Sequence, residues 1–206
     1  MHYHCPFAQR YAIEVVEAFD FRRHLGEADY AFLMEVLESI LKAKEFEVPA
    51  PLRVIGDQIV PRGGMLNFAP VGGTKEDLTE ELMQNRRAFA AFDLASGYRQ
   101  TILARLNQRL ARLIREKGLR ITLGGETSFD FVIAGKDKTN AVRTLLKLGV
   151  QRVTFLGDAL FEGGNDGVIL EFIRDWAGPR ECPLTAIRVE DWEDTIEVCR
   201  QHGWLE

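Results

Sequence analysis

The 206-residue sequence is poor in cysteine and has neither a long apolar run nor a strong excess of one charge. Its three cysteines are odd in number, far apart and without a CxxC pair (Cys5, Cys182 and Cys199), so they support neither a disulfide framework nor a zinc site. The apolar runs are too short to span a membrane, and the N-terminus lacks the basic and apolar regions of a signal peptide. We therefore expect a cytoplasmic protein with no membrane partner.

The formal net charge of −5 argues against a general attraction for nucleic acid. Any phosphate group would have to be recognised by local clusters of arginine and lysine, which favours a small ligand. With 46% apolar and 28% charged residues, the chain can bury one good core or two small ones, and disorder is not expected.

The first two thirds of the chain has the pattern of an α+β module with an antiparallel sheet. Stretches with apolar residues at helical spacing alternate with short apolar runs bounded by proline and glycine. The expected helices are residues 28–44, a helix from Thr74 and Asp77 to about residue 88, and residues 96–117 with Gly118 as the stop. The expected strands are residues 11–21, 52–60, 65–71, 119–123 and 128–133. The last three strands are expected to share one sheet, covered by the two long helices.

From residue 138 the pattern changes to the alternation of helix and strand that is typical of a parallel sheet. The expected helices are residues 139–148, 167–176 and 192–202, and the expected strands are residues 152–156 and 185–189. Ligands bind such sheets at the carboxyl ends of the strands, and Asp158 lies just past one of these ends. We expect the junction between the two modules near residues 126–135.

The loop after the first of these parallel strands carries the strongest chemical signal. Asp158, Asn165 and Asp166 lie in a glycine-rich stretch and offer hard oxygen ligands, as Mg²⁺ requires. Such residues also make ordinary turns and helix caps, so the loop alone leaves both interpretations open. Lys138 favours the chemical interpretation, because a cation at the start of a helix is slightly costly unless it meets an anion such as phosphate.

Residues 62–169 resemble a known family. Lys138 and the stretch from Gly157 to Asp166 are similar to the third and fourth motifs of the haloacid dehalogenase (HAD) superfamily, in its branch with a large α/β cap. The preceding region resembles the cap of eukaryotic-type phosphomannomutases in the order and spacing of Arg62-Gly63-Gly64-Met65-Leu66-Asn67, Pro70, Arg86, Phe89, Asp93, Arg99, Gln100, Gly124-Gly125 and Ser128-Phe129-Asp130. The resemblance implies an α/β fold with a HAD-like Rossmannoid parallel-sheet core and an inserted α+β cap that contains an antiparallel sheet.

The resemblance also implies a Mg²⁺-dependent phosphoryl transfer in the core. Carried over by position, Lys138 would neutralise the transferring phosphoryl group. Asp158 would bind Mg²⁺ directly, and Asn165 and Asp166 would complete or orient its shell.

In the cap, the resemblance assigns the sugar phosphate to four residues. Arg62 and Arg86 would grip the phosphate, while Ser128 and Asp130 would take hydroxyl groups or backbone of the sugar phosphate. Each residue also has a structural interpretation. Arg86 lies on a polar helix face that solvent can cover, and Arg62 can cap carbonyl groups beside its Gly-Gly turn. Ser128 and Asp130 share one strand face at period 2, which can be an exposed face of the sheet.

The sequence departs from the superfamily at the nucleophile. The attacking aspartate belongs to a DxDGT-like motif after the first core strand, and no such motif occurs in these residues. We expect that the N-terminal part of the core is missing, either because the chain is truncated, which we favour, or because it is an inactive remnant. Gly73 also stands where the phosphomannomutase pattern has another phosphate-binding arginine.

The activity expected of the full-length form is that of a phosphomannomutase, which converts mannose 6-phosphate to mannose 1-phosphate through a phosphoaspartate. The alternatives are a sugar-phosphate phosphatase of the same branch and a truncated, catalytically inactive protein that only binds phosphosugars. The expected domains are a remnant of the core at residues 1–21, the cap at residues 22–126 and the C-terminal part of the core at residues 127–206. The expected partner is a hexose phosphate, and the resemblance implies a homodimer formed through the cap.

Overall fold

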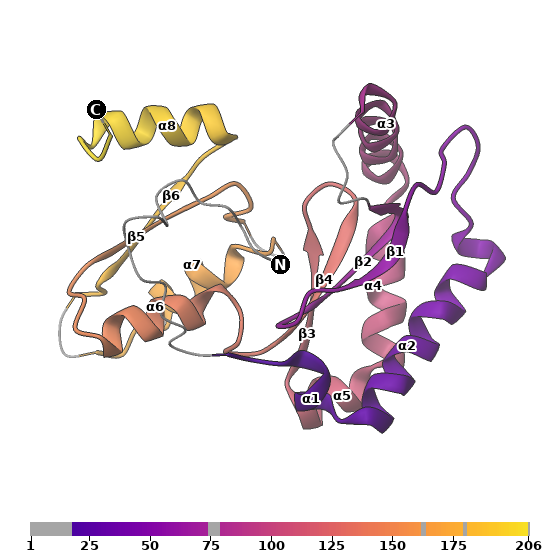
Figure 1. Cartoon of the computed structure of the whole chain (residues 1–206), viewed down its shortest axis with the longest axis horizontal. Coiled ribbons are helices and arrows are strands. Elements are labelled where there is room, and N and C mark those ends of the chain that lie inside the picture. The colour runs from indigo at the N-terminus through magenta and orange to yellow at the C-terminus, as the bar shows by residue number, and fades with distance from the viewer. Residues whose placement is uncertain (1–17, 74–78, 162–163, 179–180, 206) are drawn as a thin grey trace, which may run out of the picture.

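The protein folds in two parts, each built around its own β-sheet (Figure 1). The structure is a computed structural model and describes residues 18–73, 79–161, 164–178 and 181–205. The first part contains a four-stranded antiparallel sheet in the order β1-β2-β4-β3, and the second contains the parallel pair β5-β6. This confirms the predicted α/β class, in which an antiparallel and a parallel sheet occupy different parts of the chain.

The first part runs from α1 to β4. Its helices are α1 (Phe21–Leu25), α2 (Glu27–Lys42), the 3₁₀ turn η1 (Lys44–Phe46), α3 (Glu80–Ser96), α4 (Tyr98–Arg109) and α5 (Ala111–Lys117). Its strands are β1 (Asp57–Pro61), β2 (Leu66–Gly73), β3 (Leu119–Gly124) and β4 (Ser128–Ile133). The helix predicted at residues 28–44 and the antiparallel strands predicted from residue 65 onward are confirmed within a few residues.

The prediction of one continuous helix at residues 96–117 is wrong, because the structure divides this range among α3, α4 and α5. Gly97 ends α3 in the left-handed conformation, with a φ of 64°, so that Ser96 belongs to α3 and a new helix begins at Tyr98. Leu110, with a ψ of 12°, then separates α4 from α5. Gly118 ends α5 in the left-handed conformation, as predicted.

Two other predicted elements fall partly outside the described residues. Thr74 and Asp77 belong to the undescribed range 74–78, and within the described chain this helix begins at Glu80 with Thr79 as its cap. The strand predicted at residues 11–21 is described only from residue 18. There Phe21 opens helix α1, because the Asp20 side chain accepts a hydrogen bond from a backbone N–H in its first turn.

Strand β4 shows how the antiparallel sheet separates its two faces. Phe129, Phe131 and Ile133 point into the core and are at most 4% exposed, while Ser128 and Asp130 alternate with them on the other face. Helices α2, α4 and α5 pack on the core face, and the second part of the chain lies on the opposite side of the sheet (Figure 1). The sheet therefore presents a polar face to the part that carries Lys138.

The second part contains a smaller core between its strands and two helices. Its elements are α6 (Lys138–Lys147), β5 (Val153–Gly157), α7 (Gly167–Arg174), β6 (Leu184–Arg188) and α8 (Trp192–Gln201), which agree with the prediction within a few residues. The register runs from Val153 opposite Leu184 to Gly157 opposite Arg188, so the carboxyl ends of β5 and β6 meet at one edge. Among the described helices, none is long and apolar enough to cross a membrane.

The change from one sheet to the other comes after β4. The predicted boundary at residue 126 falls inside the β3–β4 hairpin, whereas β4 pairs with both β2 and β3. Phe21, which the prediction placed in a remnant of the core, packs in the hydrophobic core of the first part. The hydrogen-bonded sheet therefore extends beyond the range that composition and motifs assigned to the cap.

Candidate functional site

The polar face of the antiparallel sheet carries a row of hydrogen-bonding side chains. Asn67 in β2 lies opposite Asp130 in β4. Asn67 is 7% exposed, and its Nδ2 donates to Asp130 Oδ1 at 2.8 Å and to Ser128 Oγ at 3.1 Å. Ser128 Oγ in turn donates to the carbonyl oxygen of Gly124 at 2.7 Å. One buried amide therefore orients both residues that were predicted to bind the sugar.

This row packs closely against the end of β3. A Cβ atom at Gly124 would lie 2.7 Å from Oδ1 of Asp130 and 2.8 Å from Oδ2, which is too close for an ordinary contact. The predicted Gly124-Gly125 motif therefore has a physical reason at its first position, because only glycine leaves room for the Asp130 carboxylate.

A hydrogen bond from Asn165 connects this row to the second part of the chain. Asn165 lies in the loop between β5 and α7, and its Nδ2 donates to Asp130 Oδ2 at 3.3 Å. Two further contacts link the two parts: a parallel β-bridge between Leu123 and Gly164, and an ion pair between Arg120 and Glu171 at 3.0 Å. The polar face of the sheet and the β5–α7 loop thus belong to one hydrogen-bonded network.

Lys138 and Asp166 form a partly buried ion pair in this network. Asp137 caps α6 by accepting from Thr139 N at 2.9 Å, which makes Lys138 the first helical residue. Lys138 Nζ donates to Asp166 Oδ1 and, at 3.4 Å, to Asn165 Oδ1. The Asp166 side chain is 1% exposed, whereas the Lys138 side chain remains 42% exposed. Lys138 therefore neutralises a buried carboxylate and is still accessible to an anion from solvent.

The second oxygen of Asp166 holds the loop itself. Oδ2 accepts from Ala159 N at 3.1 Å, and a Cβ atom at Gly157 would lie only 2.5 Å from it. Gly157, the last residue of β5, therefore leaves room for the carboxylate. Since both oxygens accept from protein donors, Asp166 positions Lys138 and the loop.

The three predicted Mg²⁺ ligands differ in their availability. Asp158 is exposed after β5, and no hydrogen bond or ion pair with any described residue engages its carboxylate. Asn165 and Asp166 already accept from Lys138. Within the described ranges, no three His, Cys, Asp or Glu side chains are grouped to hold a metal ion. Asp158 thus has the chemistry of a direct ligand to a hard cation, and the other two suit an outer shell.

The two predicted phosphate-binding arginines lie outside this network. Arg62 is exposed in the β1–β2 turn, where its backbone N–H donates to the Met65 carbonyl at 2.9 Å, and Arg86 is half-buried in α3. Neither guanidinium makes a hydrogen bond or ion pair with another residue of the described chain. Both are therefore available to an anion, although the structure does not bring them into contact with Lys138 or Asp130.

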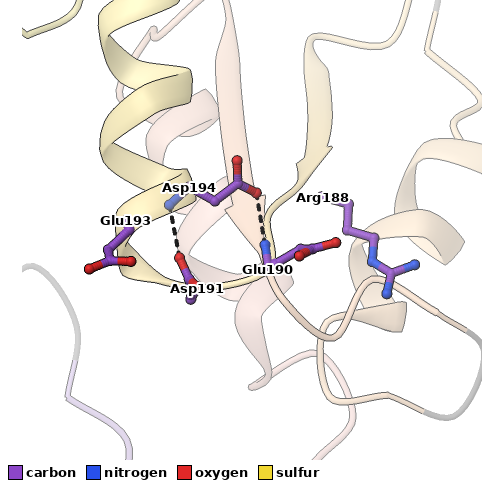
Figure 2. A pocket seen from close by; sticks show the side chains of 5 residues that line it. All are labelled: Arg188, Glu190, Asp191, Glu193 and Asp194. Atoms are coloured by element: carbon purple, nitrogen blue, oxygen red, sulfur yellow. Dashed lines mark hydrogen bonds between the residues drawn. The ribbon is translucent and has the colours of Figure 1, made fainter.

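A hollow of about 540 Å³ lies at the end of β6, but none of the predicted site residues lines it (Figure 2). Its walls are Arg188 and four acidic residues around the start of α8: Glu190, Asp191, Glu193 and Asp194. Two of these acids serve the backbone, because Asp191 accepts from Asp194 N and Asp194 accepts from Glu190 N, each at 2.9 Å. We attribute this cluster to the capping of α8.

Asn67 is the residue of the network to which the sequence pattern gave no role. In the sequence it is the last residue of the motif that begins at Arg62. A signal was nevertheless present, since Asn67 is the one amide in the otherwise apolar and glycine-containing strand β2, in which every residue except the last is buried. A buried amide in such a strand needs hydrogen-bond partners, and these turn out to be the sugar-binding candidates.

Comparison with known proteins finds a matching family model and several similar proteins. The family model described as eukaryotic phosphomannomutase matches residues 8–201. The chain is 31% identical to a phosphomannomutase of Nicotiana benthamiana over 169 residues, which cover 78% of this chain and 58% of the relative. It is 36% identical to a phosphomannomutase of Schizosaccharomyces pombe over 105 residues, which cover 51% and 37% of the two chains. It is 31% identical to phosphomannomutase 1 of Dictyostelium discoideum over 148 residues, which cover 71% of this chain and 53% of the relative.

The chain therefore spans only part of the length of each of these relatives. The family model, in contrast, matches this chain over almost its whole length. This protein belongs to the eukaryotic phosphomannomutase family, within the HAD superfamily.

Proposed function

We propose that the protein binds a hexose phosphate and serves the interconversion of mannose 6-phosphate and mannose 1-phosphate. The observation that carries this proposal is the network that joins Ser128 and Asp130 of the antiparallel sheet to Lys138 of the second part. Hydroxyl and carboxylate groups suit the hydroxyls of a sugar, and a half-exposed ammonium suits a phosphate. The phosphomannomutase names of the relatives support the same substrate class.

In this proposal each residue of the network has a defined task. Lys138 pairs with the oxygens of the phosphoryl group and offsets the charge that spreads over them during transfer. Asp130 exchanges its hydrogen bond from Asn165 for one from a sugar hydroxyl, while Asn67 keeps the carboxylate oriented. Asp166 holds Lys138 throughout, because its carboxylate stays buried.

The proposed chemistry passes through a phosphoaspartate, which requires an attacking carboxylate. The sequence contains no DxDGT-like motif, and we assign the attack to none of these 206 residues. What this chain supplies is the grip on the sugar phosphate and the positive charge of Lys138.

We further propose that Mg²⁺ binds at Asp158. The carboxylate is exposed and follows β5 at the carboxyl edge of the parallel sheet, where ligands of such sheets bind. When bound, the ion supplies charge neutralisation to the phosphoryl oxygens. Dimerisation through the cap and a cytoplasmic location stay predictions.

The reaction is tested by incubating the protein with mannose 1-phosphate and Mg²⁺ and separating the products. Mannose 6-phosphate among the products supports the mutase, whereas free phosphate without mannose 6-phosphate shows a phosphatase. Saturable binding without turnover shows a protein that only binds the phosphosugar. For these 206 residues alone, the lack of a DxDGT-like motif favours this outcome. If the protein shows neither turnover nor binding, the whole proposal is rejected.

Arg62 and Arg86 lead to a further prediction about phosphate recognition. Arg62→Ala and Arg86→Ala are each expected to raise the Kd for mannose 1-phosphate about tenfold, because each removes a charged donor that has no partner among the residues the structure describes. Arg87→Ala is the matched control, since Arg87 neighbours Arg86 but already lies 3.8 Å from Glu80 in an exposed pair. Titration calorimetry measures all three, and equal affinities of Arg86→Ala and Arg87→Ala would contradict the role of Arg86.

A further inference from the structure

We propose that Arg99 is a positioning residue for the sugar-binding segment at residues 124–130, which it holds from the core side of the sheet. The inference rests on the proposed function, because it concerns the residues assigned there to the sugar. Arg99 contacts the backbone of this segment, whereas Ser128 Oγ and the Asp130 carboxylate project from the opposite face. Its effect on a ligand is therefore indirect.

Arg99 is almost wholly buried although it carries a permanent charge. The residue is 9% exposed, and the side chains of Arg99 and Asp93 are 11% and 12% exposed. Arg99 Nε donates to Asp93 Oδ2 at 2.7 Å. Burying two charges is costly, and it is tolerated only where the charges are paired and the remaining donors find acceptors.

A second nitrogen of Arg99, Nη1, reaches both sides of the β3–β4 turn. Nη1 donates to the carbonyl oxygen of Gly125 at 2.9 Å and to that of Ser128 at 3.3 Å. Gly125 has a φ of 51° within the turn, and Gly124 pairs with Ser128 across it. Because Ser128 is the first residue of β4, fixing its carbonyl also fixes its side chain and, two residues later on the same face, Asp130.

Asp93 connects this guanidinium to two helices. Asp93 belongs to α3, and its Oδ1 accepts from the backbone N–H of Arg99 at 2.6 Å in the first turn of α4, where a negative charge is favourable. The adjacent Tyr98 donates to the Phe46 carbonyl at 2.6 Å. Burial, and then the charge of Asp93, raises the pKa of Tyr98 to about 12, so its phenol stays protonated as a donor. The turn is thus tied to a rigid junction of helices.

Arginine suits this position better than lysine. The planar guanidinium directs Nε toward the carboxylate and Nη1 toward the two carbonyl oxygens. Lysine keeps the charge beside Asp93, but its single nitrogen cannot reproduce both directions. The variant Arg99→Lys therefore separates the pairing of charge from the positioning of the turn.

The test compares Arg99→Lys with Arg105→Ala, a control on the same helix that removes an exposed ion pair with Glu45. Amide hydrogen exchange is measured on the ligand-free proteins, and the Kd for mannose 1-phosphate is measured by calorimetry. We expect Arg99→Lys to exchange about tenfold faster at residues 124–130 and to bind about tenfold more weakly. Arg105→Ala is expected to match the wild-type protein in both measurements.

The proposal would be overturned if folded Arg99→Lys exchanged its amides at residues 124–130 at the wild-type rate. It would also be overturned if the wild-type protein bound mannose 1-phosphate and Arg99→Lys bound it with the same affinity. If the wild-type protein binds no mannose 1-phosphate, the proposed function fails, and hydrogen exchange alone then decides about Arg99. Should Arg99→Lys not fold, the double variant Asp93→Leu with Arg99→Met replaces it, because it removes both buried charges together. The same acceleration at residues 124–130 is expected in that variant.

Discussion

The Asp166→Ala variant is expected to lose about 2 kcal/mol of unfolding free energy, and the loss should be confined to the second part of the chain. Asp166 is 1% exposed and accepts from both Lys138 Nζ and Ala159 N. The substitution leaves a part-buried backbone donor, Ala159 N, without its acceptor. It also removes the partner of Lys138, whose side chain is exposed enough to be solvated, so the expected loss is smaller than for a fully buried pair.

Tryptophan fluorescence during urea unfolding measures this effect selectively. All three tryptophans, Trp176, Trp192 and Trp204, lie in the second part, so their signal reports on that part alone. The control is Asp175→Ala, which removes an exposed carboxylate paired with Arg174 and should leave the fluorescence transition unchanged. A transition of Asp166→Ala that coincides with that of the wild-type protein would mean that the buried pair does not hold the β5–α7 loop.

The Asn67→Ala variant is expected to bind mannose 1-phosphate about tenfold more weakly, and Asn67→Asp more weakly still. Asn67 Nδ2 orients Ser128 and Asp130, and alanine releases both. Aspartate keeps the size of the side chain but replaces the donor by a second negative charge next to Asp130, which repels it. Loss of a buried charge-assisted donor typically costs enough for such a change in affinity.

Asn85→Ala is the matched control for this experiment. Asn85 also fixes a loop with two hydrogen bonds, since it accepts from Arg53 N at 3.0 Å and donates to the Arg53 carbonyl at 2.9 Å. It takes no part in the network around Asp130. Both variants are expected to be less stable than the wild-type protein, and only those at Asn67 should change the Kd measured by calorimetry. Equal affinities of Asn67→Ala and Asn85→Ala would remove Asn67 from the binding site.

The antiparallel sheet could be predicted because its strands carry their own signals. In β4, buried Phe129 alternates with Ser128 and Asp130, and the pair Gly124-Gly125 marks the turn before the strand. The separation of α4 from α5 could not be predicted. Leu110 continues the apolar side of the helix and is itself fully buried, and neither glycine nor proline marks the break.

The candidate site was predicted as a set of residues but not as a network. Lys138 and Asp166 are 28 residues apart, and their contact depends on how α6 and the β5–α7 loop pack. Asn67 and Asp130 are 63 residues apart and meet only because β2 pairs with β4. The engagement of both Asp166 oxygens depends on a backbone N–H that no sequence pattern reveals. Its proposed place in a metal shell stays a prediction.

In the proposed function, one hexose phosphate contacts both parts of the chain, at the polar face of the antiparallel sheet and at Lys138. Amide NMR spectra recorded during a titration with mannose 1-phosphate show whether both parts respond to the ligand. We expect saturable shifts at residues 128–130 together with residues 138 and 164–166, which belong to different parts of the chain but to one network. Shifts confined to the hollow between Arg188 and Asp194, or the absence of any saturable shift, would contradict this expectation.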